Sequence, residues 1–402
     1  MTDLVIVVRA SPAAPLCIRD TSRATSLLTN ELIFTNRLQK SLTIMTSRHR
    51  GVVYDVGLNF NNDRKFSVEP FSATLVQHDI QTIAKDLHAS AVRIEGEEIH
   101  RLVTASRAAH ECDLTVFFNP WKMHATAEET AIYVREAARE AEKLRLEGLE
   151  IVLIVGCEYS IFSRGVFPGE TFNERVVWMT GQVGETGMSH RNLPEALGEK
   201  SGRLNEVLRE LAAAAREEFG GKVTYSAGSW ELVDWSIFDI VGIDYYRRGE
   251  SAQEYTEGLE AYRLGKPLAV MEVGCCAYQG AAPRGDGGFA LLQGVNDDGT
   301  GKFLNDEEPV RSETEQADYV ETQLGLLRSA GVDAMFVFVF SFPAMKTGDG
   351  SKDLDKMGFS LVKTFPEGDP RSKEMPPWEP KEAFHRLAKL YAAEKDAADQ
   401  AA

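Results

Sequence analysis

Short apolar runs alternate with longer amphipathic segments from residue 51 to the end of the chain. The runs are apolar almost without interruption, which is typical of parallel strands that are buried on both faces. The predicted strands are residues 52–57, 91–95, 114–119, 150–158, 222–226, 238–245, 267–272 and 333–340. A strand followed by a helix, repeated around a closed sheet, predicts an α/β protein with a single-domain (β/α)8 TIM barrel.

The segments between these strands repeat apolar residues with the spacing of an α-helix. The predicted helices include residues 73–87, 127–146, 204–219, 252–264, 313–329 and 381–394. An open doubly wound sheet is the alternative architecture. It is disfavoured because no Gly-x-Gly-x-x-Gly motif follows the first strand, where its phosphate-binding loop would lie.

The two ends of the chain differ in composition from the barrel segment, residues 47–395. Residues 1–46 are rich in Ser and Thr, contain few acids and have no apolar stretch long enough for a signal-peptide core. We expect them to be a disordered or dispensable extension; an organelle-targeting segment is the alternative. Residues 396–402 contain Ala, Asp and Gln and are expected to be a disordered tail.

Composition excludes several function classes. The formal net charge of −17 is unsuitable for binding nucleic acid or an anionic membrane, because both need a basic surface. No apolar run is long enough to cross a bilayer. Five cysteines show neither zinc-binding spacing nor a disulfide pattern, so we expect reduced thiols and a cytoplasmic protein. The oligomeric state is left open.

Two glutamates each end an apolar run: Glu158 follows residues 151–157, and Glu272 follows residues 267–271. TIM-barrel enzymes carry their catalytic groups at the carboxyl ends of strands. Retaining glycosidases need two carboxyl groups about 5 to 5.5 Å apart, one as nucleophile and one as proton donor. Clusters of His and Asp at strand ends, which a metal-dependent hydrolase needs, are not seen. The pattern therefore predicts a glycosidase without metal or cofactor.

Several motifs together resemble glycoside hydrolase clan A, the retaining TIM-barrel glycosidases. Residues 266–274, Lys-Pro-Leu-Ala-Val-Met-Glu-Val-Gly, resemble its nucleophile strand, and residues 239–246, Asp-Ile-Val-Gly-Ile-Asp-Tyr-Tyr, resemble its sixth strand. Residues 91–95 resemble the strand that carries an arginine near the nucleophile. A poorly characterised group of bacterial abortive-infection proteins is another possible relative.

The resemblance implies a role for each matching residue. Glu272 would be the nucleophile and Glu158 the acid/base. Tyr245 or Tyr246 would hold the nucleophile, and Arg93 would be a positioning cation. The competing interpretations are that each glutamate is a solvated loop charge and that Arg93 only neutralises nearby acids.

The chain also departs from the clan pattern. Cys157 stands where clan members usually have the asparagine that binds the sugar 2-hydroxyl, and the eighth strand has phenylalanines in place of a tryptophan. Phe342 lies late enough in that strand to contact a sugar. Asn119 and Trp121, after the third strand, are further candidates, because an aromatic face beside polar groups suits a pyranose.

The sequence therefore predicts a retaining glycoside hydrolase, or a transglycosidase, that acts on a small soluble glycoside. The alternative is a weak or inactive barrel that binds a carbohydrate or nucleotide sugar, for instance in phage defence. The missing asparagine and tryptophan favour the alternative, and the intact carboxylate pair opposes it.

Overall fold

The computed structural model describes residues 48–63, 65–182 and 193–401. The predicted extension, residues 1–46, lies outside them. Eight parallel strands form one sheet in the order β5-β4-β3-β2-β1-β10-β7-β6. The strands are β1 (His49–Asp55), β2 (Ala91–Gly96), β3 (Thr115–Pro120), β4 (Ile151–Cys157), β5 (Lys222–Ser226), β6 (Val241–Asp244), β7 (Leu268–Val273) and β10 (Ala334–Val337). All eight predicted strands are present, and the (β/α)8 barrel is confirmed.

The barrel closes between β5 and β6 through a short contact. A single parallel bridge pairs Ala227 with Ile243, supported by the Asp244 amide, which donates to the Ala227 carbonyl at 2.8 Å. Gly242 allows this approach, because a Cβ there would lie 2.2 Å from the Tyr225 carbonyl oxygen. The seam between β5 and β6 is therefore the weakest junction of a nearly closed barrel.

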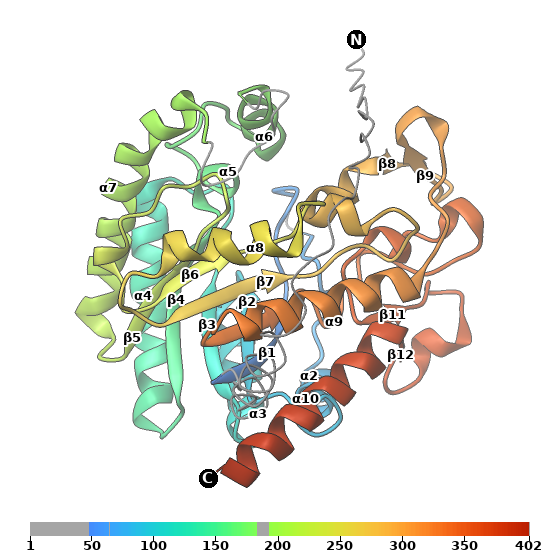
Figure 1. The fold of residues 1–402 in the computed structure, drawn as a ribbon, viewed down its shortest axis with the longest axis horizontal. Helices are drawn as coiled ribbons and strands as arrows, with labels where there is room; N and C mark the ends of the chain where they lie inside the picture. The colour runs from blue at the N-terminus through green and yellow to red at the C-terminus, as the bar shows by residue number, and fades with distance from the viewer. Residues whose placement is uncertain (1–47, 64, 183–192, 402) are drawn as a thin grey trace, which may run out of the picture. The chain divides into compact units, whose positions relative to one another are not determined.

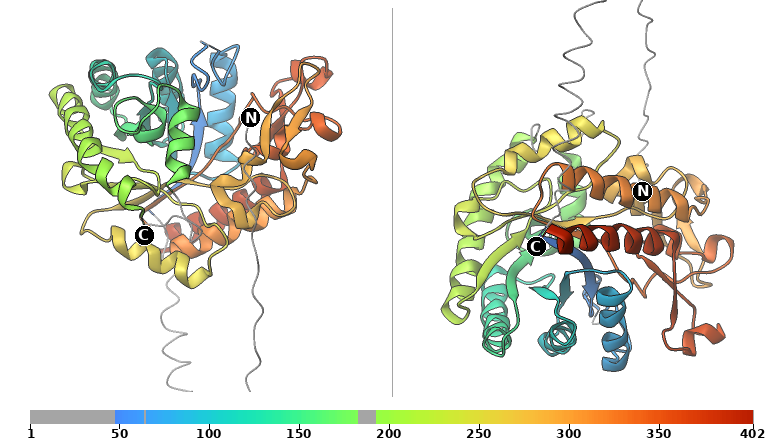
Figure 2. Two further views of the ribbon diagram at one scale, coloured as in Figure 1. Left: turned by 90° about the horizontal axis from the view of Figure 1, so that it is seen from above. Right: turned by 60° about the horizontal axis from the view of Figure 1, so that its bottom comes forward.

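Helices surround the strands (Figures 1 and 2). They are α2 (Ala73–Lys85), α3 (Ile99–His110), α4 (Ala127–Leu146), α7 (Glu195–Glu218), α8 (Ala252–Gly258), α9 (Glu313–Ser329) and α10 (Glu382–Ala401). Helix α4 begins with a capping box, in which the Thr126 side chain accepts from the Glu129 amide and the Glu129 carboxylate accepts from the Thr126 amide. Helix α10 continues past residue 395, where the sequence predicts the barrel to end.

Two apolar layers hold the barrel together. The interior layer includes Val53, Phe117, Met271 and Phe336, and the rings of Phe117 and Phe336 lie 4.7 Å apart. The outer layer lies between strands and helices, as side chains alternate across each strand. These layers make the strands rigid supports for the groups at their ends.

The loops after β4 and β7 contain additional structure. The loop after β4 carries α5 (Tyr159–Phe162) and α6 (Phe172–Gly181). The loop after β7 carries the 3-10 segment η3 (Ala282–Leu291) and the hairpin of β8 (Leu292–Val295) and β9 (Gly301–Phe303). A second small sheet pairs β11 (Val362–Thr364) with β12 (Trp378–Pro380).

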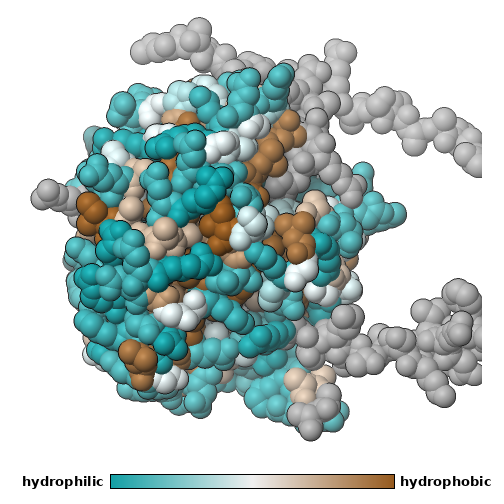
Figure 3. All heavy atoms as spheres, turned by 90° about the vertical axis from the view of Figure 1, so that its left-hand side faces the viewer, coloured by the Kyte–Doolittle hydropathy of each residue, from teal (hydrophilic) through white to brown (hydrophobic). Residues whose placement is uncertain are grey.

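The face shown in Figure 3 is hydrophilic over most of its area and carries small, separate hydrophobic spots. Single exposed apolar residues are normal on a protein surface and indicate no docking site. Within the described residues, no helix combines the length and hydropathy needed to span a membrane.

Candidate active site

Glu272 lies near the end of β7, and its side chain is only 9% exposed. Both of its carboxylate oxygens have partners. Arg93 Nη1 lies 2.9 Å from Oε1, and the Tyr246 hydroxyl donates to Oε2 at 2.8 Å. The two contacts fix the carboxylate plane, and charge-assisted bonds of this kind are stronger than neutral ones.

Arg93 is the central cation of the site. It points from β2 into the barrel, is fully buried and also lies 3.1 Å from Glu95 Oε2. Arg93 therefore makes both of the contacts considered for it, one with Glu95 and one with Glu272. Asn119, at the end of β3, accepts from Arg93 Nε at 3.1 Å. Asn119 thus orients the arginine and is completely buried.

The two tyrosines after β6 face different ways. Tyr246 contacts Glu272, whereas the Tyr245 hydroxyl donates to the Tyr255 carbonyl of α8 at 2.8 Å. The ring of Tyr245 also packs against that of Tyr255. Successive side chains on an extended chain point to opposite sides, which explains the difference. Of the two tyrosines considered, Tyr246 is therefore the one that contacts Glu272, and the Tyr245 hydroxyl binds α8 instead.

Glu158 directly follows β4 and has a left-handed backbone, with φ 43° and ψ 44°. Only glycine adopts this conformation without strain, so a glutamate there costs free energy that the surroundings must supply. Its amide donates to the Ser226 carbonyl of β5 at 2.9 Å. Strained backbone of this kind often occurs at functional sites.

The pKa of the Glu158 carboxyl is raised well above its usual value. Burial is the main cause, and the negative charges of Asp244 and Glu272 add to it, followed by Glu231 and Asp286. A raised pKa keeps a carboxylic acid protonated near neutral pH, as a general acid requires. The residues that follow Glu158 contribute to this burial, because Tyr159 and Ile161 are themselves buried.

The chain places two further groups against Glu272: Cys157, noted in the sequence as a departure from the clan pattern, and Asp244, which was not predicted. The Cys157 thiol lies 3.6 Å from Glu272 Oε1 and 3.7 Å from Asp244 Oδ2. Asp244 ends β6 and accepts from the Ser226 hydroxyl at 2.7 Å. Asp244 is a carboxylate at a strand end, the signal that identified Glu158 and Glu272, so the same rule could have found it.

Cys157, Asp244 and Glu272 have the spacing of a metal site, since one donor atom of each lies within 4.8 Å of the others. Their chemistry does not fit a divalent cation. Arg93 Nη1 already lies 2.9 Å from Glu272 and 3.7 Å from Asp244, and its charge would repel a metal. Burial, followed by the charge of Asp244, raises the pKa of the Cys157 thiol, which opposes the thiolate form that binds metals.

Aromatic rings form two groups near the carboxyl ends of the strands. Trp121 packs on Phe162 with ring centroids 4.8 Å apart, and Phe60 contacts both Phe162 and Phe342. Trp121 and Phe342 therefore belong to one aromatic wall. The Trp121 Nε1 has no hydrogen-bond partner among the described residues.

The second aromatic group is nearer to the nucleophile. Phe338 follows β10 directly, and its ring contacts Phe359, which in turn contacts Tyr246. Phe338 is half-buried and was not among the predicted sugar contacts, because nothing in the sequence distinguishes it from the other phenylalanines of that strand.

An ion pair joins two loops close to Glu158. Arg248, after β6, makes a bidentate pair with Asp286 of η3 at 2.6 Å, and also donates to Ser229 at 3.1 Å. Asp286 contributes to the raised pKa of Glu158, and Glu158 contributes to the raised pKa of Arg248. The loops after β5, β6 and β7 thus meet beside the proton-donor candidate.

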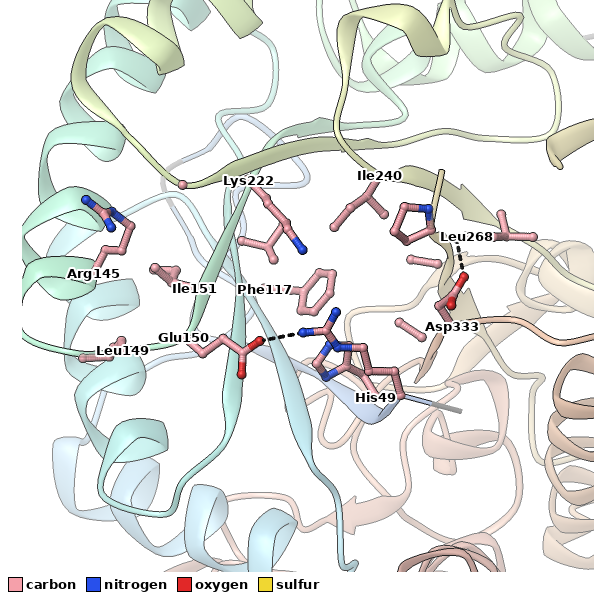
Figure 4. A pocket seen from close by; sticks show the side chains of 16 residues that line it. His49, Phe117, Arg145, Leu149, Glu150, Ile151, Lys222, Ile240, Leu268 and Asp333 are labelled. Atoms are coloured by element: carbon pink, nitrogen blue, oxygen red, sulfur yellow. Dashed lines mark hydrogen bonds and ion pairs between the residues drawn. The ribbon is translucent and has the colours of Figure 1, made fainter. Parts of the chain in front are cut away.

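A cavity of about 290 Å³ lies at the opposite end of the barrel (Figure 4). Its lining includes residues at or near the starts of strands, among them His49, Lys222 and Leu268, together with the interior ring of Phe117. Arg48 pairs with Glu150 at its rim. In TIM barrels this end serves stability and the other end carries the chemistry. A second cavity, of about 400 Å³, lies outside the barrel between the loop after β6 and α9.

The comparisons with known proteins agree with this architecture. No protein-family model matches the chain, and neither does any curated protein. Among solved structures, a GH113 β-1,4-mannanase matches with a TM-score of 0.53 and 15% identity, over 87% of this chain and 99% of the mannanase. β-Glucuronidase 2 of Bacteroides uniformis matches with a TM-score of 0.51 and 14% identity, over 85% of this chain and 35% of that protein.

At this identity the likeness shows the fold alone. The chain has the TIM-barrel fold of clan A glycosidases, as the resemblance in its motifs implied. The comparisons give no support for a relation to abortive-infection proteins.

Proposed function

We propose that this protein is a retaining glycoside hydrolase, or a transglycosidase, acting on a small soluble glycoside. One observation supports the proposal most strongly. Glu272 is oriented by Arg93 at 2.9 Å and by Tyr246 at 2.8 Å, while the nearby Glu158 has a pKa raised by burial and neighbouring charge. Double displacement requires one carboxyl that is positioned to attack and one that can donate a proton.

In the proposed first step, Glu272 attacks the anomeric carbon as the bond to the leaving oxygen breaks, and Glu158 gives its proton to that oxygen. In the second step, water attacks the glycosyl ester and Glu158 takes the proton of the water, which releases Glu272. Arg93 and Tyr246 hold Glu272 in the attacking orientation. A sugar hydroxyl in place of water gives transfer.

A panel of chromogenic aryl glycosides tests the proposal, with wild type beside Glu272→Ala and Glu158→Ala. We expect Glu272→Ala to abolish turnover of every substrate. In Glu158→Ala, the rate of the glycosylation step should fall by about 10²- to 10⁴-fold for substrates with poor leaving groups. For substrates with activated leaving groups, this rate should fall much less. Glu136→Ala, on the exposed face of α4, is the control. Unchanged turnover by Glu272→Ala would contradict the proposal.

The second candidate is a barrel that binds a carbohydrate without turnover. The observation in its favour is Cys157, whose thiol lies 3.6 Å from Glu272 where the resemblance leads us to expect an asparagine. Incubation with activated 2-fluoro-glycosides separates the two candidates. A covalent label on the peptide that contains Glu272 supports the hydrolase, and reversible binding without label or turnover supports the binding protein.

A further inference from the structure

We propose that Glu231, in the loop between β5 and β6, is a positioning residue that holds Glu158 in place as proton donor. The inference rests on the proposed function, because it concerns how the acid/base of that reaction is oriented. Glu231 is only 2% exposed and lies outside the pair of carboxyls that would react.

The Glu231 carboxylate binds the segment that directly follows Glu158. Its Oε1 accepts from the Ser160 amide at 3.0 Å and from the Ser160 hydroxyl at 2.5 Å. Its Oε2 accepts from the Tyr225 hydroxyl at 2.8 Å and from the Gly228 amide at 3.2 Å. Four donors on one buried carboxylate make a nearly saturated site, since such a group accepts about four hydrogen bonds.

Two aromatic side chains extend this network. The Tyr225 hydroxyl accepts from the Tyr159 amide at 2.7 Å, so the tyrosine connects Glu231 to the residue next to Glu158. The Trp230 indole donates to the Ser160 hydroxyl at 3.0 Å. Both backbone amides that follow Glu158 therefore have side-chain acceptors contributed by β5 and the loop after it.

The backbone at Glu158 needs such support. Its left-handed conformation persists only where the surroundings determine it, and α5 spans only four residues, too few to hold its own first turn. Amides at the start of a helix have no partner within the helix. The Glu231 network supplies partners for two of them and so fixes the direction of the Glu158 side chain.

The same network acts on the proton affinity of Glu158. Groups of several elements face Glu158: Asp244 of β6, Glu272 of β7, Glu231 itself, and Asp286 of η3 with its partner Arg248. Removal of the Glu231 charge leaves the other charges in place and lowers the pKa of Glu158, because one repulsive neighbour is lost. The basic limb of the pH–rate profile should then move to lower pH.

The test compares Glu231→Gln with wild type on two aryl glycosides that share a sugar and differ in leaving-group acidity. We expect kcat/KM to fall by about 30-fold or more for the poor leaving group and by less than about 3-fold for the activated one, since misplaced acid catalysis affects only proton donation. Tyr225→Phe keeps the Glu231 carboxylate and removes the hydrogen bonds of the Tyr225 hydroxyl to Glu231 and to the Tyr159 amide. It should show a smaller fall in kcat/KM for the poor leaving group.

Glu394→Gln is the matched control. Glu394 is a fully buried glutamate on α10 that pairs with Arg328 at 2.8 Å, so this substitution also removes a buried charge. It should leave both the leaving-group dependence and the pH profile unchanged. Thermal unfolding of all variants checks that differences in activity do not follow from unfolding.

Three outcomes would overturn the inference. If kcat/KM of Glu231→Gln fell equally for both substrates, Glu231 would have a structural role only. If kcat/KM equalled that of wild type for both, Glu231 would have no role in the reaction. If Glu158→Gln itself leaves turnover of the poor substrate unchanged, the proposed function fails and the inference fails with it.

Discussion

Glu158 combines a proposed chemical role with an unfavourable backbone conformation. At φ 43° a glycine is free of the strain that a side chain suffers, so Glu158→Gly should be more stable than Glu158→Ala by about 1 kcal/mol. Both variants should lose proton donation to the same extent. Denaturant unfolding measures the difference in free energy, and aryl glycosides measure the activity.

The matched control for this prediction is Asp113, an exposed turn residue with φ 57°. Asp113→Gly should also be more stable than Asp113→Ala, with activity unaffected in both. If glycine gave no advantage over alanine at position 158 but did so at position 113, the strain at Glu158 would be refuted.

Asp244 should make stability depend on pH. Burial, followed by the charge of Glu272, raises its pKa well above the usual value. The folded state therefore keeps a proton that the unfolded chain has lost, so stability is highest at low pH and falls as the pH rises through the folded-state pKa. The loss is about 1.4 kcal/mol for each unit of difference in pKa.

Asp244→Asn should reduce this loss, because an amide does not titrate and can still accept from the Ser226 hydroxyl. Unfolding free energies at pH 5 and pH 8 provide the measurement. Asp297→Asn, at an exposed loop position, is the control and should leave the dependence unchanged. If the free energy of unfolding of Asp244→Asn fell as steeply between pH 5 and pH 8 as that of wild type, Asp244 would not be the group responsible.

Part of the site could be predicted from the sequence because it follows one rule. Glu158, Glu272 and Arg93 lie on or directly after apolar strands, where a barrel places its chemistry. Glu231 lies in an irregular loop, and only the folded chain brings it to Ser160. Tyr245 and Tyr246 could not be distinguished, since a shift of one residue reverses the direction of a side chain.

At the scale of elements, the seam between β5 and β6 should be sensitive to side-chain size. Gly242→Ala would place a Cβ 2.2 Å from the Tyr225 carbonyl oxygen, a backbone atom that cannot move alone. We expect a loss of about 2 kcal/mol or more in stability. Circular dichroism during denaturant unfolding measures it.

Gly202→Ala is the control, and we expect it to stabilise the protein where Gly242→Ala destabilises it. Gly202 is exposed on α7, and a Cβ there meets no atom within 4 Å. Because alanine is the better helix former, this substitution should stabilise the protein by about 0.5–1 kcal/mol. A stable Gly242→Ala protein would show that β5 and β6 do not need their close approach.

The elements themselves were predictable where periodicity is strong. The predicted limits of α4 and α9 match the structure, and all eight strands were found. Helix α3 is not among the helices named from the sequence, and no side chain caps its start at Glu98. Helix α6 is also not among the predicted helices, because its ten residues are too few for a clear period.

At the scale of the whole molecule, charge should select the substrate. Four carboxyls meet at the carboxyl ends of the strands, Glu95, Glu158, Asp244 and Glu272, and Arg93 is the cation that contacts three of them. Arg248 is already paired with Asp286. A sugar that carries its own carboxylate would find both arginines already paired, and burial of a charge without a partner costs free energy.

We therefore expect neutral aryl glycosides to be turned over at least about 10-fold more efficiently than the matching aryl glucuronide. The measurement is kcat/KM for a glucoside, a mannoside and a glucuronide with the same leaving group. Added salt should change the difference little, because these charges are buried and salt screens exposed charge more than buried charge. A preference for the glucuronide would refute this electrostatic argument.

The cavity at the amino ends of the strands has a consequence for how this protein can change. That cavity is lined mainly by residues near the starts of strands, whereas the carboxylates lie near the ends of strands, so a mutation at one end need not contact the other. Mutations that fill this cavity and stabilise the protein would then offset the loss of stability that changes in the catalytic loops cause. The barrel could thus accept new loops and remain folded.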